Sequence, residues 1–417
     1  MSSFSPLQAF AGYGIELEYM IVDRKTLSVL PIADALLCKV AGAFVSEVQR
    51  GKFGWSNELV LHLIEIKNTS PDPLLDPLPT AFQNEVRQIN RLLEPMDAKL
   101  MPTGMHPWMN PLNETHLWPH DNAAIYRAYD RIFDCKKGHG WANLQSMHLN
   151  LPFANDDEFA RLHAAIRLVL PILPALAASS PIAEERFTGF MDFRMEAYRT
   201  NALRIPSSTG QVIPDNITSQ VEYKSRILAP LYRDIAALDP EGVLQHEWIN
   251  SRGAIPRFDR NAIEIRVIDL QECPEADIAI AAATSSVVKM LYDNQVSPLS
   301  LQQEISTVSL VEIMQACIRD AEQAVIFDSE YLARLGFPER RCEAKELWRH
   351  LIEKTLPGFP DQHATWQKSL GVILDQGPLA RRITRAVGST CERSRLEAVY
   401  AELCTCLGEG RLFQGLN

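Results

Sequence analysis

The alternation of apolar and polar residues predicts that this chain forms a sheet with one unusual face. In residues 14–23 (GIELEYMIVD), Glu16 and Glu18 share one face of a strand, opposite Ile15 and Leu17. Two unit charges roughly 6–7 Å apart repel by about 2–3 kcal/mol at an effective dielectric constant of about 20. Either a solvated sheet edge or a bound divalent cation would relieve this repulsion.

A second strand is predicted over residues 57–67 (NELVLHLIEIK), which carries Glu58 and Glu65. Their odd separation places the two carboxylates on opposite faces of an ideal strand, so a bulge or an early strand start is needed to bring them together. The segment 104–107 (GMHP) looks like a strand end or a loop with an exposed histidine, His106.

Two further segments alternate in the same way. In residues 145–152 (QSMHLNLP), His148 lies on the polar face, and in residues 261–269 (NAIEIRVID), Glu264 and Arg266 do. Taken singly, His148 could be a half-exposed strand histidine, and the Glu264–Arg266 pair could be an ion pair of small energetic value. Ligand-type side chains on four strands, however, favour one functional face on a common sheet.

Helices are predicted between and after these strands. Thr80, with a glutamine three residues later, has the spacing of a capping box, and Pro274 begins a long alanine-rich helix. No internal repeat and no change in composition marks a second domain. We therefore expect a single domain over the whole chain, with a sheet-rich core over about 10–295 and a helical C-terminal region over about 296–417.

The composition is that of an ordinary globular protein. The chain has 417 residues, of which 46% are hydrophobic, and its net charge of −11 argues against binding to nucleic acid. The N-terminal residues lack the features of a signal peptide, and the most apolar segment, 162–178, is interrupted by an arginine and two prolines. The eight cysteines are scattered without a CxxC pair, so we expect reduced thiols in a cytoplasmic protein that does not enter a membrane.

Carboxylates and one imidazole on a common concave face predict a site for hard cations. Such a ligand set suits Mg²⁺ or Mn²⁺, and these ions usually complete their shells with phosphate oxygens. Arg194 and Arg252 add cations near the predicted face, although such arginines are often surface ion-pair partners. The chain has no Walker A motif and no GxGxxG after a strand, so the residues predict a nucleotide triphosphate site without either common phosphate loop.

Five segments, in order, carry a resemblance to a known family. The chain resembles the bacterial and plant-type glutamate–cysteine ligases, which include broader carboxylate–amine ligases with a glutamine-synthetase-like fold. Within residues 12–290, the resembling segments are GIELEYMIVD, GMHP, SMHLNLP, SSPIAEERFTGFMDFR and NAIEIRVIDLQECP. Met105 and Ala262 stand where threonine is common in the family. The implied fold is α+β, a curved antiparallel sheet with helices on its convex side and a helical C-terminal region.

The resemblance also implies roles for individual residues. Metal ligands around the ATP phosphates correspond to five side chains here: Glu16, Glu18, Glu65, His148 and Glu264. Glu58 falls where related enzymes have an acidic residue near the amino group of the acceptor. Arg266 matches the arginine that meets the transferred phosphoryl group. Arg194, and more weakly Arg252, match positions that bind a substrate carboxylate or phosphate.

The implied reaction has two steps. ATP phosphorylates a carboxylate, the γ-carboxylate of glutamate in the type reaction, and an amine then attacks the acyl phosphate to form an amide. We expect a glutamate–cysteine ligase that uses ATP and Mg²⁺ or Mn²⁺, acts on small molecules and can form homo-oligomers. A ligase of the same fold with another amine or carboxylate, and a nucleotide-binding homologue without catalytic activity, are the alternatives.

Overall fold

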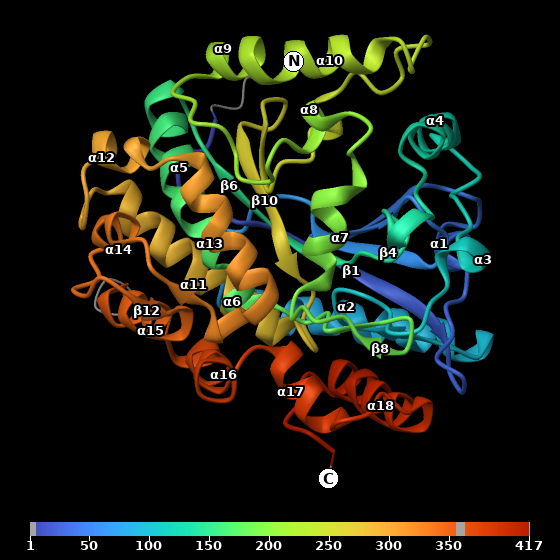
Figure 1. Cartoon of the computed structure of the whole chain (residues 1–417). Helices are drawn as coiled ribbons and strands as arrows, with labels where there is room; N and C mark the ends of the chain where they lie inside the picture. The colour runs from blue at the N-terminus through green and yellow to red at the C-terminus, as the bar shows by residue number, and fades with distance from the viewer. Residues whose placement is uncertain (1–5, 356–362, 417) are drawn as a thin grey trace.

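An antiparallel sheet of eight strands runs through the middle of the protein (Figure 1). The computed structural model describes residues 6–355 and 363–416. Seven strands follow the order β2-β3-β4-β1-β6-β10-β9, and β5 pairs with the far end of β1. The strands are β1 (Gly14–Asp23), β2 (Glu47–Arg50), β3 (Phe53–Asn57), β4 (Leu63–Asn68), β5 (Ala98–Met101), β6 (Ser146–Pro152), β9 (Ala254–Arg257) and β10 (Ala262–Asp269).

The pairing of the strands sets which polar residues are neighbours. Glu18 lies directly opposite Glu65 across β1 and β4, and Glu16 lies opposite His148 across β1 and β6. Because side chains alternate along each strand, these four residues share one face of the sheet. On β10, Glu264 lies opposite Asn150 of β6, which extends the same polar face.

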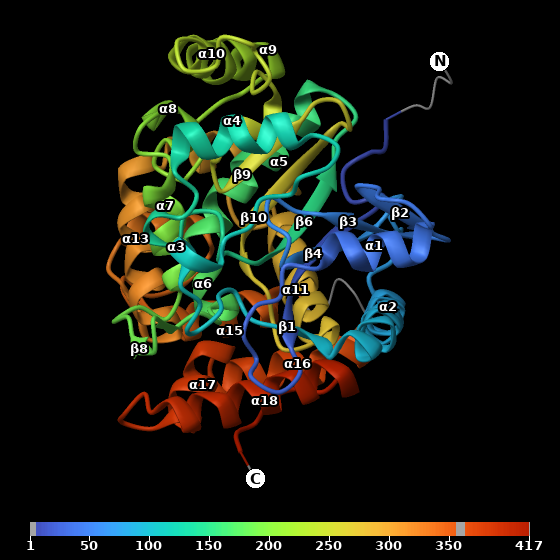
Figure 2. The same cartoon turned by 90° about the vertical axis from the view of Figure 1, so that its right-hand side faces the viewer.

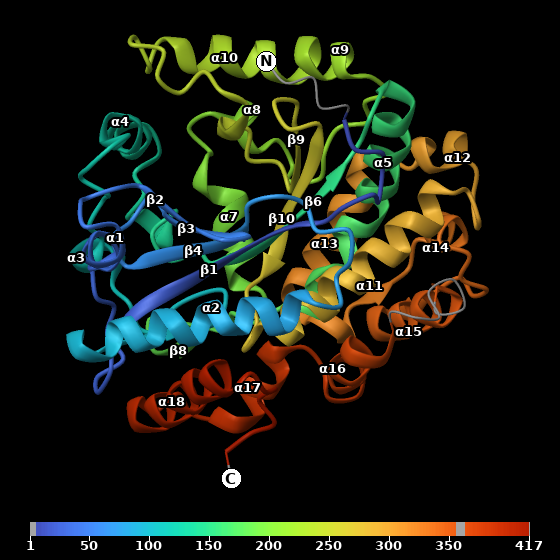
Figure 3. The same cartoon turned by 180° about the vertical axis from the view of Figure 1, so that it is seen from behind.

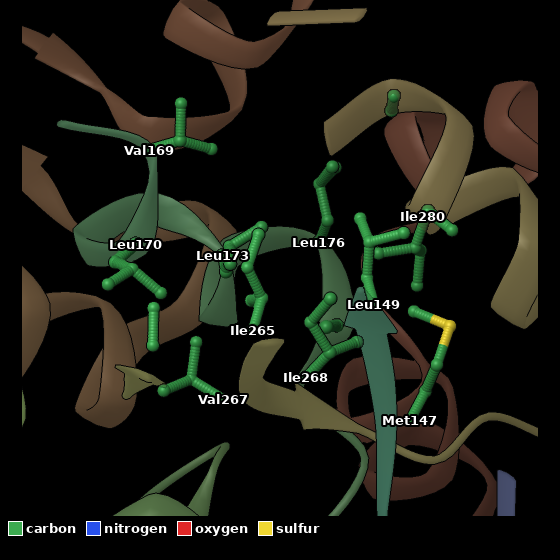
Figure 4. Packing of buried hydrophobic residues seen from close by; sticks show 14 of the residues in the cluster. Met147, Leu149, Val169, Leu170, Leu173, Leu176, Ile265, Val267, Ile268 and Ile280 are labelled. Atoms are coloured by element: carbon green, nitrogen blue, oxygen red, sulfur yellow. The ribbon is translucent and has the colours of Figure 1, made fainter. Parts of the chain in front are cut away.

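The opposite face of the sheet is apolar and buried. Ile15 and Leu17 of β1 are fully buried, and the core continues into β6 and β10. Figure 4 shows Met147 and Leu149 near Ile280 of helix α11 (Pro274–Tyr292). Seen from behind, α11 and α2 (Leu78–Leu93) cross this face, and α11 also packs on α5 (Asp156–Val169) (Figure 3). Burial of this face fixes the register of the strands.

The remaining helices surround the sheet and form the C-terminal region. Figure 2 shows α16–α18 at the end of the protein opposite α9 and α10. Two short hairpins, β7 (Ile182–Ala183) with β8 (Arg186–Phe187) and β11 (Val325–Ile326) with β12 (Cys342–Glu343), lie outside the main sheet. The N-terminal helices are α1 (Ala33–Ala41), α3 (Pro111–Glu114), α4 (Ala123–Phe133), α6 (Pro174–Ala177), α7 (Phe193–Asn201), α8 (Pro206–Thr209), α9 (Gln220–Tyr223) and α10 (Ala229–Ala236). The C-terminal ones are α12 (Leu299–Glu304), α13 (Thr307–Asp320), α14 (Ser329–Arg334), α15 (Ala344–Thr355), α16 (His363–Gln376), α17 (Leu379–Val387) and α18 (Arg393–Glu409).

This arrangement confirms the predicted α+β class, an open antiparallel sheet with helices and a helical C-terminal region. Helix α11 begins at Pro274, as the sequence predicts. In the described part of the chain, no helix combines the length and the apolar character that a membrane crossing requires.

Three local predictions are wrong. Residues 57–67 are not one strand, because β3 ends at Asn57 and β4 begins only at Leu63. Thr80 does not cap a helix, because α2 already begins at Leu78 and its N-cap residue, Pro77, has no side-chain hydrogen-bonding group. His106, predicted to be exposed, is fully buried, and its ring bonds the backbone carbonyl of Leu27 at 2.8 Å.

A buried histidine in the helical layer predicts sensitivity of the fold to acid. His163 of α5 is 1% exposed and packs against Phe159 and Tyr223, and neither ring nitrogen has a hydrogen-bond partner among the described residues. Burial, with the nearby charge of Arg167, lowers its pKa to about 3. In the unfolded chain the histidine pKa is about 6.5. Between about pH 6.5 and pH 3, His163 is therefore protonated in the unfolded chain and neutral in the folded chain.

Stability should accordingly be complete above about pH 6.5 and fall as the pH drops. We expect His163→Phe to reduce the loss of unfolding free energy between pH 7 and pH 5 by about 2 kcal/mol. Urea unfolding at both pH values measures this, with His116→Phe at an exposed position as the control. An identical loss in wild type and His163→Phe would contradict the prediction.

Candidate active site

A cavity of about 580 Å³ lies over the polar face of the sheet. Strands β1, β4, β6 and β10 form its floor, and residues from α4, α7 and the segments around Trp141 and Trp248 also line it. We refer to it as the central cavity. Its charged and titratable lining residues include Glu16, Glu18, Glu58, Glu65, His148, Arg194, Arg257, Arg260, Glu264 and Arg266.

His148 stands between two groups of carboxylates. Its Nδ1 lies 3.0 Å from Glu16 Oε2 and 3.7 Å from Glu264 Oε1, and its Nε2 lies 3.7 Å from Glu18 Oε1. Burial disfavours the charged imidazole, but the hydrogen bond with Glu16 and the neighbouring charges outweigh it and raise the pKa of His148 to about 9. Without another cation, the imidazolium itself balances part of the negative charge.

The donor atoms fit hard divalent cations. Two sets, Glu16–His148–Glu264 and Glu18–Glu65–His148, each bring their ligand atoms within 4.8 Å of one another. Carboxylate oxygens with a single imidazole nitrogen suit Mg²⁺ or Mn²⁺.

Neighbouring groups orient these carboxylates. One oxygen of Glu18 accepts hydrogen bonds from the backbone N–H and the hydroxyl of Ser146, at 2.6 and 3.0 Å. One oxygen of Glu65 accepts from Ser56 at 2.8 Å and Lys67 at 3.1 Å. In each case the second oxygen remains for a ligand, which is how outer partners fix metal-binding side chains.

Two arginines hold Glu264, which is 1% exposed. Arg257 Nη1 bonds one carboxylate oxygen at 2.9 Å, and Arg266 bonds the other through Nε at 3.0 Å. Burial opposes ionisation of Glu264, but Arg266, His148 and Arg257 outweigh it and lower its pKa. Glu264 is therefore a carboxylate at neutral pH, and it presents the two guanidinium groups to the cavity.

Glu58 has the opposite electrostatic character. Burial and the charges of Glu65 and Glu18 raise its pKa well above the ordinary value for glutamate. It lies in the segment between β3 and β4, so the break in the strand removes the problem of its odd spacing from Glu65 and brings both residues to one cavity.

Arg194 is anchored by a buried ion pair below the cavity. Its Nε bonds Asp269, whose other oxygen accepts hydrogen bonds from the Ser179 N–H and the Ser180 hydroxyl, both at 2.8 Å. Gly104 lies so close that an added Cβ would stand 2.6 Å from the Asp269 carboxyl carbon. This close approach explains the glycine of the GMHP segment.

The structure brings all but one of the predicted site residues to the central cavity. Arg252 does not line it, which corrects the prediction made from sequence. Its guanidinium instead bonds Asp215 at 2.9 Å and the Ser207 carbonyl at 3.0 Å, so it ties two loops together. The roles of the other residues as metal ligands and catalytic groups stay predictions.

The sequence interpretation missed the side chains that form the walls. Tyr126 and Tyr129 come from α4, Trp141 comes from a turn, and Trp248 comes from a short 3-10 helix, Glu247–Ile249. No periodic pattern marks residues on loops, so only the resemblance of segments or a structure locates them. The hairpin of β9 and β10 places Arg257 on Glu264.

Comparison with known proteins decides the family. Residues 13–333 match the family described as glutamate-cysteine ligase family 2. The chain belongs to this family. The match contains all the predicted site residues and so confirms the resemblance seen in the sequence.

Relatives of this family member include proteins with and without an assigned activity. An uncharacterized protein from Archaeoglobus fulgidus is 32% identical over 96% of this chain and 99% of its own length. A putative glutamate–cysteine ligase 2 from Bradyrhizobium sp. (strain ORS 278) is 24% identical over 68% of this chain, which spans 62% of that protein.

Solved structures show the same fold at low identity. A glutamate–cysteine ligase from Francisella tularensis, solved in complex with AMP, superposes with a TM-score of 0.61 at 14% identity, covering 96% of this chain and 89% of that one. A bifunctional glutathione synthetase from Pasteurella multocida gives a TM-score of 0.54 at 14% identity, covering 96% of this chain and 53% of that one.

The crowding of carboxylates predicts opposite effects of one substitution with and without metal. In Glu65→Gln the amide oxygen can still accept from Ser56 and Lys67, while one negative charge near Glu16 and Glu18 is lost. We expect the metal-free protein to gain about 1 kcal/mol of stability and the rise in melting temperature on adding Mn²⁺ to shrink or vanish.

The control is Glu47→Gln, which removes another carboxylate that pairs with Lys67, at 3.2 Å, from outside the metal-ligand sets. It should keep the Mn²⁺-dependent rise of the wild type. Thermal unfolding with and without Mn²⁺ measures both variants. If Mn²⁺ raised the melting temperature of Glu65→Gln as much as that of the wild type, the assignment of Glu65 as a metal ligand would be contradicted.

The ion pair beneath Arg194 predicts a large loss of stability when it is broken. Asp269→Asn leaves the guanidinium of Arg194, itself 1% exposed, without its counter-charge. We expect a loss of about 3 kcal/mol in unfolding free energy. Glu94→Gln, which breaks an exposed pair with Arg24, should cost less than about 1 kcal/mol. Urea unfolding of both compares them, and equal effects would contradict the prediction.

Proposed function

We propose that this protein is an ATP-dependent ligase that joins a carboxylate to an amine through an acyl phosphate, with glutamate as the carboxylate substrate. Cysteine is the acceptor that family membership puts forward first. The observation that carries the proposal is the convergence of Glu16, Glu18, Glu65, His148 and Glu264 with Arg266 in one cavity. Such a site neutralises a triphosphate from two directions, by divalent cations and by guanidinium groups.

In the first step, the γ-phosphoryl group of ATP passes to an oxygen of the substrate carboxylate, and ADP is released. Mg²⁺ bound by the carboxylates and His148 would screen the phosphate charges. Arg266, held by Glu264, presents its guanidinium to the charge that develops on the transferred group. Arg194, fixed by Asp269, offers a second cation for a carboxylate or phosphate oxygen.

In the second step, the amine attacks the acyl carbon, and phosphate leaves as the carbon–oxygen bond breaks. The amine must first lose a proton, because an ammonium has no free electron pair. Glu58 is suited to accept it, since burial and its acidic neighbours raise its pKa well above the ordinary value for glutamate and so make its carboxylate a stronger base. No covalent bond to the protein is required, so the residues act by placement and by charge.

The proposal predicts ADP release that depends on glutamate and on an added amine. Glu264→Gln keeps the size of the side chain but removes the charge that holds Arg257 and Arg266, so we expect turnover to fall by on the order of 10²–10³. Glu304→Gln on the exposed side of α12 is the matched control and should leave turnover unchanged.

A coupled assay for ADP, with mass spectrometry of the amide, measures these rates. Absence of glutamate- and amine-dependent ADP release across a panel of amines would contradict the ligase. If the wild type shows no turnover and Glu264→Gln binds nucleotide as tightly as the wild type, the protein would instead be a homologue without catalytic activity.

A further inference from the structure

Glu58 differs from the other acids of the central cavity in how its carboxylate is partnered, since the charge of Lys67 acts on it without a direct ion pair. Among the described residues, its carboxylate has no hydrogen-bond or ion-pair partner. The other four lining glutamates all have partners of these kinds, namely His148 and Asn150 for Glu16, Ser146 for Glu18, Ser56 and Lys67 for Glu65, and Arg257 and Arg266 for Glu264. A carboxylate turned into a cavity without a partner favours a cationic ligand.

Four aromatic residues line the same cavity as Glu58. Tyr126, Tyr129, Trp141 and Trp248 form what we call the aromatic wall. The ring centroid of Tyr129 lies 5.7 Å from that of Trp141 and 6.5 Å from that of Trp248, so these rings form one continuous surface. The hydroxyl of Tyr126 accepts a hydrogen bond from Asn57, the residue before Glu58, at 2.9 Å.

The aromatic wall offers a ligand ring faces and the neutral hydroxyls of Tyr126 and Tyr129, and it carries no positive charge. The indole N–H of Trp141 is buried without a hydrogen-bond partner in the described part of the chain, and apolar Leu59 and Ile125 also line the cavity. Aromatic faces attract cations and pack against apolar bodies, but they offer nothing to a carboxylate.

The arginines of the central cavity already have carboxylate partners. Arg194 pairs with Asp269, and both Arg257 and Arg266 pair with Glu264. Arg260, 54% exposed, stands 3.7 Å from Asp259 and 3.9 Å from Glu16. The phosphates of ATP and the carboxylates of glutamate must share these cations. A further carboxylate on the acceptor, next to Glu58, would meet repulsion without compensation.

We propose that the acceptor of this ligase is a primary amine without a carboxylate group, whose ammonium binds Glu58 and whose apolar or aromatic body lies on the aromatic wall. This inference rests on the proposed ligase function, and it puts such an amine in place of cysteine as the second substrate.

The chemistry balances with this acceptor. The ammonium gives one proton to the Glu58 carboxylate, and the freed nitrogen electron pair forms the bond to the acyl carbon. The bond from that carbon to the phosphate oxygen breaks, and its electron pair leaves with phosphate. The nitrogen loses its second proton to the departing phosphate or to water, and the neutral amide remains.

Two pairs of amines that differ by one carboxylate test the inference. Cysteamine is cysteine without its carboxylate, and 2-phenylethylamine is phenylalanine without its carboxylate. With ATP, Mg²⁺ and glutamate held at saturation, kcat/KM of each amine is measured by ADP release, and each product is identified by mass. We expect each amine to exceed its amino acid by roughly tenfold or more, because an unpaired buried carboxylate costs at least about 1.4 kcal/mol.

A variant of the aromatic wall gives a second measurement. Trp141→Leu should lower kcat/KM for 2-phenylethylamine by roughly tenfold through loss of the ring contact. The rise in melting temperature with Mn²⁺ should stay as in the wild type, which shows that the fold and the carboxylates are intact. An unchanged rate with 2-phenylethylamine would remove the aromatic wall from the acceptor site. The comparison of amine pairs in the wild-type protein does not depend on this variant.

The outcomes separate the two proposals. A higher kcat/KM for cysteine than for cysteamine would overturn the inference on the acceptor and leave the ligase standing. The absence of ADP release with every amine and amino acid would overturn both. A preference for both amines over their amino acids supports the inference.

Discussion

Repulsion between buried carboxylates is the constraint on which this structure depends. Five glutamates line one cavity, and the side chain of one of them, Glu264, is 1% exposed. A folded chain tolerates such a group only with opposite charge close by. The positive charge comes from three sources: Arg257 and Arg266 on β9 and β10, His148 between the glutamates, and Lys67 of β4. The arrangement is what a protein needs if the remaining positive charge arrives with its substrates.

The apolar face of the sheet makes this concentration of charge possible. Ile15, Leu17, Met147 and Leu149 are fully buried on the helical side. A shift of one residue in the register of β1 would turn Ile15 and Leu17 to the cavity and Glu16 and Glu18 into the core. Hydrophobic burial thus fixes the positions of Glu16, Glu18 and His148. The free energy gained by packing the apolar face of these strands offsets the unfavourable electrostatic energy of the charged face.

The same reasoning explains how much of the site the sequence predicts. Glu16, Glu18, His148 and Glu264 lie in long strands with strict alternation, so their common face follows from the pattern. Glu58 does not, because β3 ends one residue before it and nothing in the apolar run from 57 to 67 marks that break.

Residues outside regular strands and helices escape prediction for a different reason. Arg252 has the charge that the site requires, yet Asp215 and a backbone carbonyl draw it elsewhere, and such tertiary partners are invisible in one sequence. Trp141 and Trp248 contact the cavity from segments whose course is set only by the complete fold. The overall class of fold, by contrast, rests on long periodic segments and on the order of five resembling segments, and both signals are local.

This division between strands and loops has a consequence for function. The groups suited to phosphoryl transfer stand on four paired strands. A shift of one strand would displace its neighbours, so the positions of these groups depend on the integrity of the sheet. The groups that we propose as the acceptor site stand on α4 and on segments outside the sheet, which can change without moving the sheet. Membership of glutamate-cysteine ligase family 2 therefore carries more information about the activation of the carboxylate than about the amine. The identity of that amine has to be sought in the charge and shape of the cavity wall of this particular chain.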